Sequence, residues 1–181
     1  MRLPSILLLA LAAPCLSFAQ ESQPVMLANP DFEEGTPDDP APGWTIERTG
    51  EVELTGEMPA SGKQALILKN GYGVISQNFV NIPGLNRYKS FKVNVVARSP
   101  DAAKFGIRAG FFKINDDGKQ VWLDLPLVWD RPLRPDNEQL TLTGTLPNNE
   151  EGGRFWIAFY RSKKEGTVIL DSVKLEFMPR E

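Results

Sequence analysis

The feature that most constrains the fold is a series of short segments in which apolar and polar residues alternate. The clearest is 88–98, whose apolar positions are Phe91, Val93, Val95 and Ala97. Alternation with a period of two places one set of side chains on each face of a β-strand. No segment after residue 19 shows a sustained helical period. About ten such strands at roughly ten-residue spacing predict an all-β, antiparallel jelly-roll β-sandwich.

The N-terminus has the layout of a secretory signal peptide. Arg2 precedes an apolar stretch at 6–16, and the small residues Ser17 and Ala19 stand three and one positions before Gln20. This layout predicts cleavage after Ala19 and a secreted or periplasmic protein. The length of the remaining chain predicts a single domain over residues 20–181. Cys15 leaves a lipoprotein open as an alternative, although Pro14 stands where a lipobox has a small residue. No later stretch approaches the roughly 20 apolar residues of a transmembrane helix.

Composition excludes several kinds of chemistry. The chain has no histidine, and its one cysteine, Cys15, lies in the predicted leader. Catalysis by a histidine base or a cysteine nucleophile, and an ordinary zinc site, are therefore excluded from residues 20–181. The formal net charge of −3 argues against a polyanion-binding face and a nucleic-acid partner, and leaves only a local basic patch open. Only carboxylate chemistry remains, and no spacing in the sequence identifies a catalytic pair, so we expect no enzyme.

The segment 166–177 is predicted to be the closing strand. Alternation places Asp171 in one row with Ile169, Val173, Leu175 and Phe177, so a single carboxylate interrupts an apolar face. A core-facing carboxylate is costly unless it is paired or holds a metal. The acidic segment 29–35 offers further oxygen ligands if the two ends of the domain meet. A metal site is one interpretation, and the alternative is that Asp171 accepts hydrogen bonds from backbone amides.

Sugar-binding sites of jelly rolls usually combine aromatic and polar side chains, and residues of both kinds lie here on predicted non-core faces and in loops. Aromatic rings pack on pyranose faces, while amides, carboxylates and guanidinium groups hydrogen-bond hydroxyls. The strand candidates are Asn94, Arg108, Trp122, Asp124, Trp156 and Tyr160, and the loop candidates are Tyr72 and Trp129.

Two locations for a sugar remain open. Trp156 and Tyr160 share one side of a strand, with an expected spacing of roughly 6–7 Å that approaches one pyranose repeat. The rival location is the rim, formed by Tyr72 and a predicted loop at 126–137 that holds Trp129. The alternative to a sugar site is that Trp156 and Tyr160 pack under a covering loop. Trp44, by contrast, is expected in the core.

Several motifs, taken in order, resemble those of a known family. They are Asn29 to Gly35 followed by Pro42-Gly43-Trp44, the turn and strand at 61–66, Ser76-Gln77, Tyr88 before a long strand, and 168–175 around Asp171. The chain resembles the galactose-binding-like jelly rolls. It is closest to the carbohydrate-binding modules appended to xylanases and other glucanases.

The resemblance implies both a ligand and a metal. It implies a non-catalytic, lectin-like module that binds a poly- or oligosaccharide. It also implies a structural calcium ion between the first and last strands, held by Glu33, Asp171 and backbone oxygen at or near Lys63. Ser172 stands where family members often carry a second acidic residue, which removes one possible ligand. Because many jelly rolls of this type bind no sugar, the alternative is a structural or protein-interaction module of the cell envelope, with an envelope protein as partner.

Overall fold

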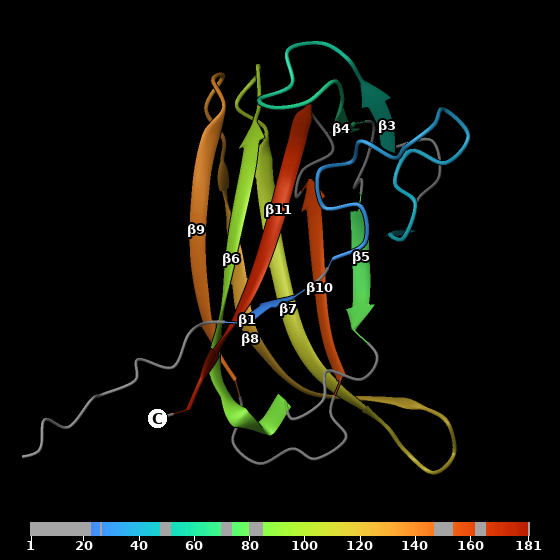
Figure 1. Ribbon diagram of the computed structural model, residues 1–181, viewed down its shortest axis with the longest axis vertical. Coiled ribbons are helices and arrows are strands. Elements are labelled where there is room, and N and C mark those ends of the chain that lie inside the picture. The colour runs from blue at the N-terminus through green and yellow to red at the C-terminus, as the bar shows by residue number, and fades with distance from the viewer. Residues whose placement is uncertain are drawn as a thin grey trace, which may run out of the picture.

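Two antiparallel β-sheets form the molecule, as the computed structural model in Figure 1 shows. The structure describes residues 23–25, 27–47, 52–69, 74–79, 85–146, 154–161 and 166–180. The predicted leader and Tyr72 lie outside these ranges. Within them, no helix is both long enough and apolar enough to cross a membrane.

The six-stranded sheet contains both the longest alternating segment and the closing strand. β1 (Gln23–Val25) pairs with residues 175–177 of β11. The other strands lie in the order β3 (Val52–Thr55), β4 (Ala65–Leu68), β11 (Val168–Pro179), β6 (Tyr88–Arg98) and β9 (Glu138–Thr145). The strand predicted at 88–98 is confirmed with the same bounds, and the short 3₁₀ turn η1 (Leu85–Arg87) leads into it.

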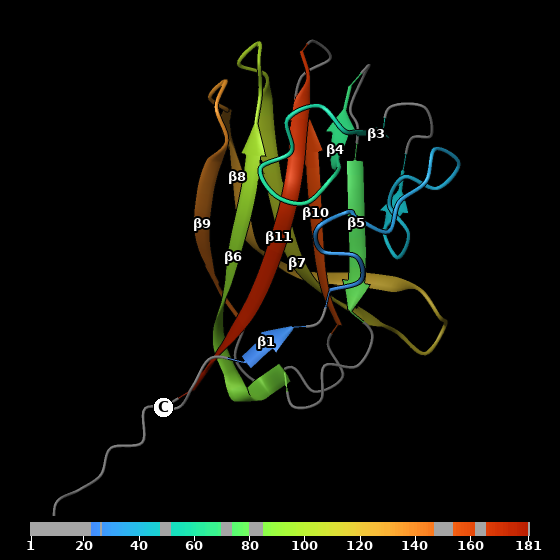
Figure 2. The ribbon, with the colours of Figure 1, turned by 45° about the horizontal axis from the view of Figure 1, so that its top comes forward.

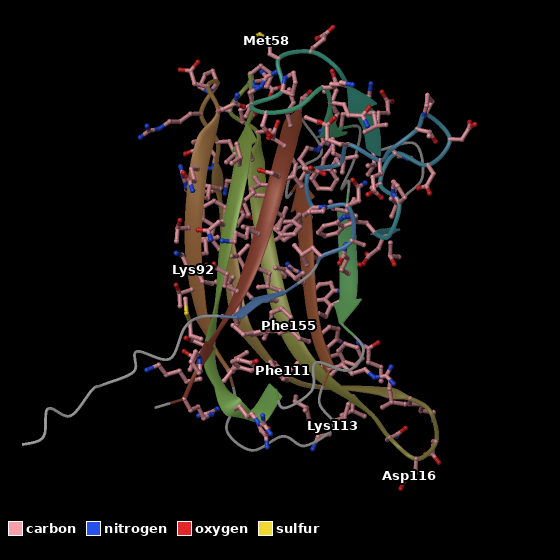
Figure 3. The ribbon with its side chains drawn as sticks, viewed as in Figure 1. Met58, Lys92, Phe111, Lys113, Asp116 and Phe155 are labelled. Atoms are coloured by element: carbon pink, nitrogen blue, oxygen red, sulfur yellow. The ribbon has the colours of Figure 1, made fainter. Side chains whose placement is uncertain are left out.

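The five-stranded sheet lies against the first. Its order is β2 (Thr45–Ile46), β5 (Val74–Phe79), β10 (Arg154–Arg161), β7 (Lys104–Ile114) and β8 (Gln120–Pro132). β7 and β8 form a hairpin, whose tip carries Asp116 and projects beyond the sandwich (Figure 3).

Aromatic side chains from both sheets fill the space between them. The ring of Phe155 on β10 contacts Phe91 on β6 at 4.8 Å and Phe177 on β11 at 5.3 Å between centroids. Phe111 on β7 packs on Phe155 from within its own sheet, and Figure 3 shows both rings in the interior. Trp44 is buried as expected and lies 5.8 Å from Phe159. The prediction of an all-β sandwich is therefore confirmed.

The predicted loop at 126–137 is wrong over its first half. β8 continues to Pro132, so Trp129 lies in a strand, paired with Ile107. Prolines had indicated a loop because proline cannot donate to a β-ladder. β8 is an edge strand, however, and an edge strand tolerates proline because half of its N–H groups need no partner.

The expected position of Asp171 within a core-facing row is also wrong. The register of β11 against β6 shifts between Leu170 and Ser172, so Asp171 is an extra residue at a β-bulge. Before the bulge the core-facing residues are Val168 and Leu170, and after it the row resumes at Val173. A bulge reverses the parity of the alternation, which a strict two-residue period does not register.

Candidate functional site

The outer face of the five-stranded sheet gathers most of the aromatic candidates. On β7 the residues Phe105, Ile107 and Phe111 are buried toward the core. The intervening positions Gly106, Arg108, Gly110 and Phe112 therefore point to the outer face. On β10 the outward residues are Trp156, Ala158 and Tyr160, between Phe155, Ile157 and Phe159 of the core, although Ala158 itself is covered and only 1% exposed. We call this surface, with Trp122 of β8, the aromatic face.

One end of the aromatic face is an aromatic cluster. Trp156 lies opposite Gly110 in the β10–β7 register, so no side chain of β7 competes for that space. The rings of Trp156 and Trp122 meet edge to face with centroids 5.3 Å apart. Trp122 also packs on Phe112 at 5.5 Å, yet 46% of Trp122 remains exposed. The cluster therefore fixes the orientation of its rings and still presents aromatic surface to solvent.

The other end is built on Tyr160. A Cβ atom at Gly106 would lie 2.2 Å from Cζ of Tyr160, so the ring packs directly on the backbone of β7. The guanidinium carbon of Arg108 lies 4.9 Å from the centre of the same ring. This is a cation–π contact, which holds the exposed Arg108 in place without neutralising its charge.

A row of non-aromatic residues crosses the sheet between the two ends. The strand registers pair Thr45 with Ser76, Ser76 with Ala158, Ala158 with Arg108, and Arg108 with Val128. Ala158 thus lies between Trp156 and Tyr160 on one face, and the expected spacing of roughly 6–7 Å is wrong. The two aromatic residues are four positions apart, which is about 13 Å along a strand. They can contact two separate sugar units with a third between them.

The structure removes Asn94 from this surface. Asn94 lies on β6 in the opposite sheet, where its Oδ1 accepts a hydrogen bond of 2.8 Å from the Thr141 hydroxyl of β9. Alternation identified its outward direction, but not which sheet contains β6. Asp124 belongs to β8, although its side chain is outside what the structure describes, as is Tyr72.

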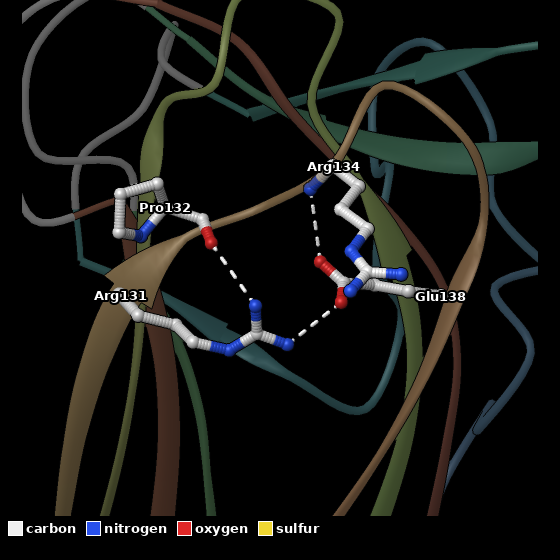
Figure 4. Close-up of polar contacts among 4 residues, drawn as sticks. All are labelled: Arg131, Pro132, Arg134 and Glu138. Atoms are coloured by element: carbon white, nitrogen blue, oxygen red, sulfur yellow. Dashed lines mark hydrogen bonds and ion pairs between the residues drawn. The ribbon is translucent and has the colours of Figure 1, made fainter.

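Trp129, expected in a loop at the rim, lies in β8 instead, and its rim partner Tyr72 is outside the described residues. Its ring packs on the buried Phe105 at 6.2 Å, and the Arg131 guanidinium lies 5.3 Å from it. Glu138 fixes that arginine with an ion pair of 2.6 Å and accepts the Arg134 backbone N–H at 2.9 Å (Figure 4). Burial raises the pKa of Glu138, but the bonds from Arg134 and Arg131 outweigh it and lower the pKa below its usual value. The arrangement closes the sheet edge.

The three residues expected to hold calcium are brought together by one loop. Oε1 of Glu33 accepts the backbone N–H groups of Lys63 and Gln64 at 2.8 and 3.0 Å. Oδ1 of Asp171 accepts the Ala60 N–H at 2.7 Å, and its Oδ2 accepts the Ser61 hydroxyl at 2.9 Å. The two carboxylates thus clamp the loop at 60–64, which crosses in front of β11 in Figure 2.

These contacts do not fit a calcium site made by the Glu33 and Asp171 side chains. Calcium takes six to eight oxygen ligands, whereas here the carboxylates receive N–H and O–H donors. The described part of the chain holds no cluster of three or more His, Cys, Asp or Glu side chains. The arrangement is the amide-binding alternative for Asp171, and calcium stays a prediction of the resemblance.

Sequence reasoning missed four residues of the aromatic face. Phe112 supports Trp122, Gly106 and Gly110 make room for aromatic rings, and Arg154 lies opposite Phe112 at the end of β10. Alternation already placed Phe112 and both glycines beside Arg108. The missing information was the β10–β7 register, which shows that each glycine faces an aromatic residue.

The chain is similar to several solved carbohydrate-binding modules. The sequence itself matches no family model and no curated protein. The CBM22-1 xylan-binding domain of Paenibacillus barcinonensis Xyn10C superposes with a TM-score of 0.54 and 17% identity, over 83% of this chain and 93% of that domain. Family 16 Carbohydrate Binding Module-2 superposes with a TM-score of 0.56 and 13% identity, over 82% of this chain and 97% of that module. TmCBM61, solved in complex with β-1,4-galactotriose, superposes with a TM-score of 0.51 and 14% identity, over 82% of this chain and 95% of that module.

At these identities the likeness concerns the fold. The chain has the β-sandwich fold of carbohydrate-binding modules, as the sequence motifs implied. Ligand and site must be argued from the residues of this chain.

Proposed function

We propose that this protein is a non-catalytic carbohydrate-binding module that binds an oligo- or polysaccharide across the aromatic face. The observation that carries the proposal is the pair of aromatic platforms, Trp156 with Trp122 at one end and Tyr160 at the other, separated by the small Ala158. Exposed aromatic rings on a rigid sheet suit the apolar faces of pyranose rings. The structural neighbours named for xylan and galactotriose support the same class of ligand.

The two platforms favour binding to the interior of a glycan chain. About 13 Å along β10 separates Trp156 from Tyr160. A chain that lies along β10 can place one sugar unit on each platform and a further unit beside the exposed Arg108. Because both platforms lie on a sheet face, on strands and not in loops, binding there does not require a chain end.

The first experiment measures binding of the protein to a panel of soluble neutral and acidic polysaccharides by affinity electrophoresis and calorimetry. We expect at least one glycan class to bind, and Trp156→Ala to weaken that binding at least tenfold. Asn94→Ala is the matched control, because it changes an outward residue of the opposite sheet. Absence of binding across the panel would contradict the proposal, as would equal effects of the two variants.

A second candidate function rests on exposed apolar side chains along the β7–β8 hairpin. Ile114, Val121, Leu123, Leu125 and Val128 are 37–59% exposed. Exposed apolar side chains along one hairpin suit contact with another protein, which favours an envelope-protein partner. Leu123→Asp with Leu125→Asp tests this candidate. Loss of co-purification with an envelope protein, together with unchanged glycan binding, would support it, and unchanged co-purification would remove it.

We also propose that the protein is exported and that its leader is removed after Ala19. The charged, apolar and small-residue layout of residues 1–19 supports this proposal. Intact-mass measurement of the protein from the cell exterior or periplasm tests it. A mature chain beginning at Gln20 is expected. A lipid-modified N-terminus at Cys15 would support the lipoprotein alternative instead.

A further inference from the structure

Several cations elsewhere on the surface have carboxylate partners, whereas two arginines of the aromatic face do not. Lys69 pairs with Glu53 at 2.6 Å, Lys174 with Glu176 at 2.8 Å, and Arg131 with Glu138 at 2.6 Å. Between described residues no ion pair reaches Arg108 or Arg154. Both extend from the five-stranded sheet toward the side that carries Trp156, since Arg108 lies opposite Ala158 and Arg154 opposite Phe112.

The position of Arg108 is the more informative of the two. It is exposed, and Tyr160 holds its guanidinium through the ring face, which leaves the N–H edge of the group without a carboxylate. Asp130, the acidic residue whose described side chain belongs to this face, lies opposite Gly106 and makes no ion pair with Arg108. In a chain with a net charge of −3, an unneutralised guanidinium at the centre of an aromatic surface indicates an anion in the ligand.

We infer that the aromatic face binds an acidic glycan, whose anionic substituent is received by Arg108. This inference rests on the proposed function and adds the class of sugar. A guanidinium presents its N–H groups in a planar fork that matches the two oxygens of a carboxylate, and it also donates hydrogen bonds to a sulfate group. Because Arg108 lies opposite Ala158, it is about 7 Å along the strand from the level of each platform. The acidic unit is therefore the one between the units on Trp156 and Tyr160.

The test compares each acidic polymer with its own neutral form. Polygalacturonate and glucuronoxylan are used before and after carboxyl reduction, and dextran sulfate is used beside dextran. Arg108→Gln removes the charge, and Arg108→Lys keeps the charge but removes the planar fork. Arg87→Gln, an exposed arginine of η1 outside the aromatic face, is the control that lowers net charge equally. Circular dichroism melting verifies that every variant is folded.

We expect an acidic polymer to bind at least tenfold more tightly than its neutral form, because hydrogen bonds to a charged group are strong. Arg108→Gln should abolish that preference, Arg108→Lys should retain part of it, and Arg87→Gln should leave it unchanged. A preference for carboxylated polymers identifies a uronic acid, and a preference confined to dextran sulfate identifies a sulfate ester. Both support the inference.

Other outcomes overturn it. Equal affinity for native and carboxyl-reduced polymers, with dextran sulfate and dextran also equal, would contradict the acidic ligand and leave the proposed function intact. Equal weakening by Arg108→Gln and Arg87→Gln would show that bulk charge attracts the polymer. No binding of any polymer, neutral or acidic, would remove the proposed function itself.

Discussion

The outer faces of the two sheets have the same backbone geometry and opposite surface chemistry. On the six-stranded sheet, Glu176 lies between Lys174 at 2.8 Å and Lys92 at 3.9 Å, and β9 presents a row of threonine hydroxyls at 141, 143 and 145. Figure 3 shows Lys92 on that outer side. On the five-stranded sheet, aromatic rings and an unpaired arginine occupy the equivalent positions.

The difference separates a solvated surface from one suited to a ligand. The ion pairs and hydroxyls of the six-stranded sheet satisfy one another or water, so this face has little to gain from an added partner. Exposed aromatic surface and an unpartnered guanidinium do gain when a ligand covers them. The contrast therefore supports the aromatic face as the functional one.

The largest expected effect tests which side of β10 is core. Phe155→Ala should lower the free energy of unfolding by about 3–5 kcal/mol, because its ring contacts Phe91, Phe111 and Phe177. Trp156→Ala, one position away, should cost no more than about 1.5 kcal/mol and mainly reduce glycan affinity. Urea unfolding measures both. A loss for Trp156→Ala as large as that for Phe155→Ala would show that the two sides have been assigned in reverse.

Two glycines that each lie beneath an aromatic ring sharpen the comparison. A Cβ atom at Gly144 would lie 2.2 Å from Cζ of the fully buried Phe91, and one at Gly106 would lie 2.2 Å from Cζ of Tyr160. Gly144→Ala should destabilise the protein by about 1–3 kcal/mol, because Phe91 cannot move within a packed core.

Gly106→Ala should affect binding more than stability. Tyr160 is only partly buried, so its ring can move outward and take Arg108 with it. Calorimetric titration with the best glycan should show weaker binding for Gly106→Ala, and Gly144→Ala, measured where it is folded, should bind normally. Normal binding by Gly106→Ala would show that the Tyr160 position does not matter to the site.

The loop clamp at 60–64 predicts a stability effect in the absence of metal. Asp171→Ala leaves the N–H groups of Ala60 and Ser61 without their acceptor, and should cost about 1–3 kcal/mol. Because amide donors already satisfy the carboxylates, we expect the same melting temperature with calcium and with chelator. A clear rise with calcium would instead establish the metal site that the family resemblance predicts.

The clamp also predicts weakening in acid. The backbone N–H groups of Gln64 and Lys63 lower the pKa of Glu33 below its usual value of 4.5. A carboxyl group whose pKa is lower in the folded state stabilises the fold above the unfolded pKa. This contribution is lost as the pH falls from about 4.5 through the folded pKa. Melting between pH 7 and pH 3 should show a smaller acid-induced loss for Glu33→Gln than for the parent protein.

The smallest effect belongs to the solvated face. The hydrogen bond from Lys174 lowers the pKa of Glu176 and outweighs the opposing effect of burial, so the group is ionised at neutral pH. Glu176→Gln should nevertheless change stability by no more than about 1 kcal/mol and leave glycan affinity unchanged, because exposed pairs are screened by solvent. A tenfold change in affinity would show that the six-stranded sheet takes part in binding.

The local alternation of apolar and polar residues determined where several strands lie and which way their side chains point. Strict alternation was enough to predict β6 with its observed bounds and the outward direction of Arg108, Trp156 and Tyr160. These features depend on neighbouring residues alone, because a pleated strand turns successive side chains to opposite faces whatever the rest of the fold does.

Only the tertiary structure decided which strands share a sheet and in what register. Asn94 and Arg108 both point outward, yet they lie on opposite sheets, because strand order depends on pairing between distant segments. The bulge at Asp171 and the extension of β8 through Pro126 likewise follow from the neighbouring strand or its absence. A one-residue shift in either element moves every later side chain to the other face. The sequence therefore indicates that Arg108, Trp156 and Tyr160 point outward, and long-range pairing brings them together with the glycines and Phe112 of the aromatic face.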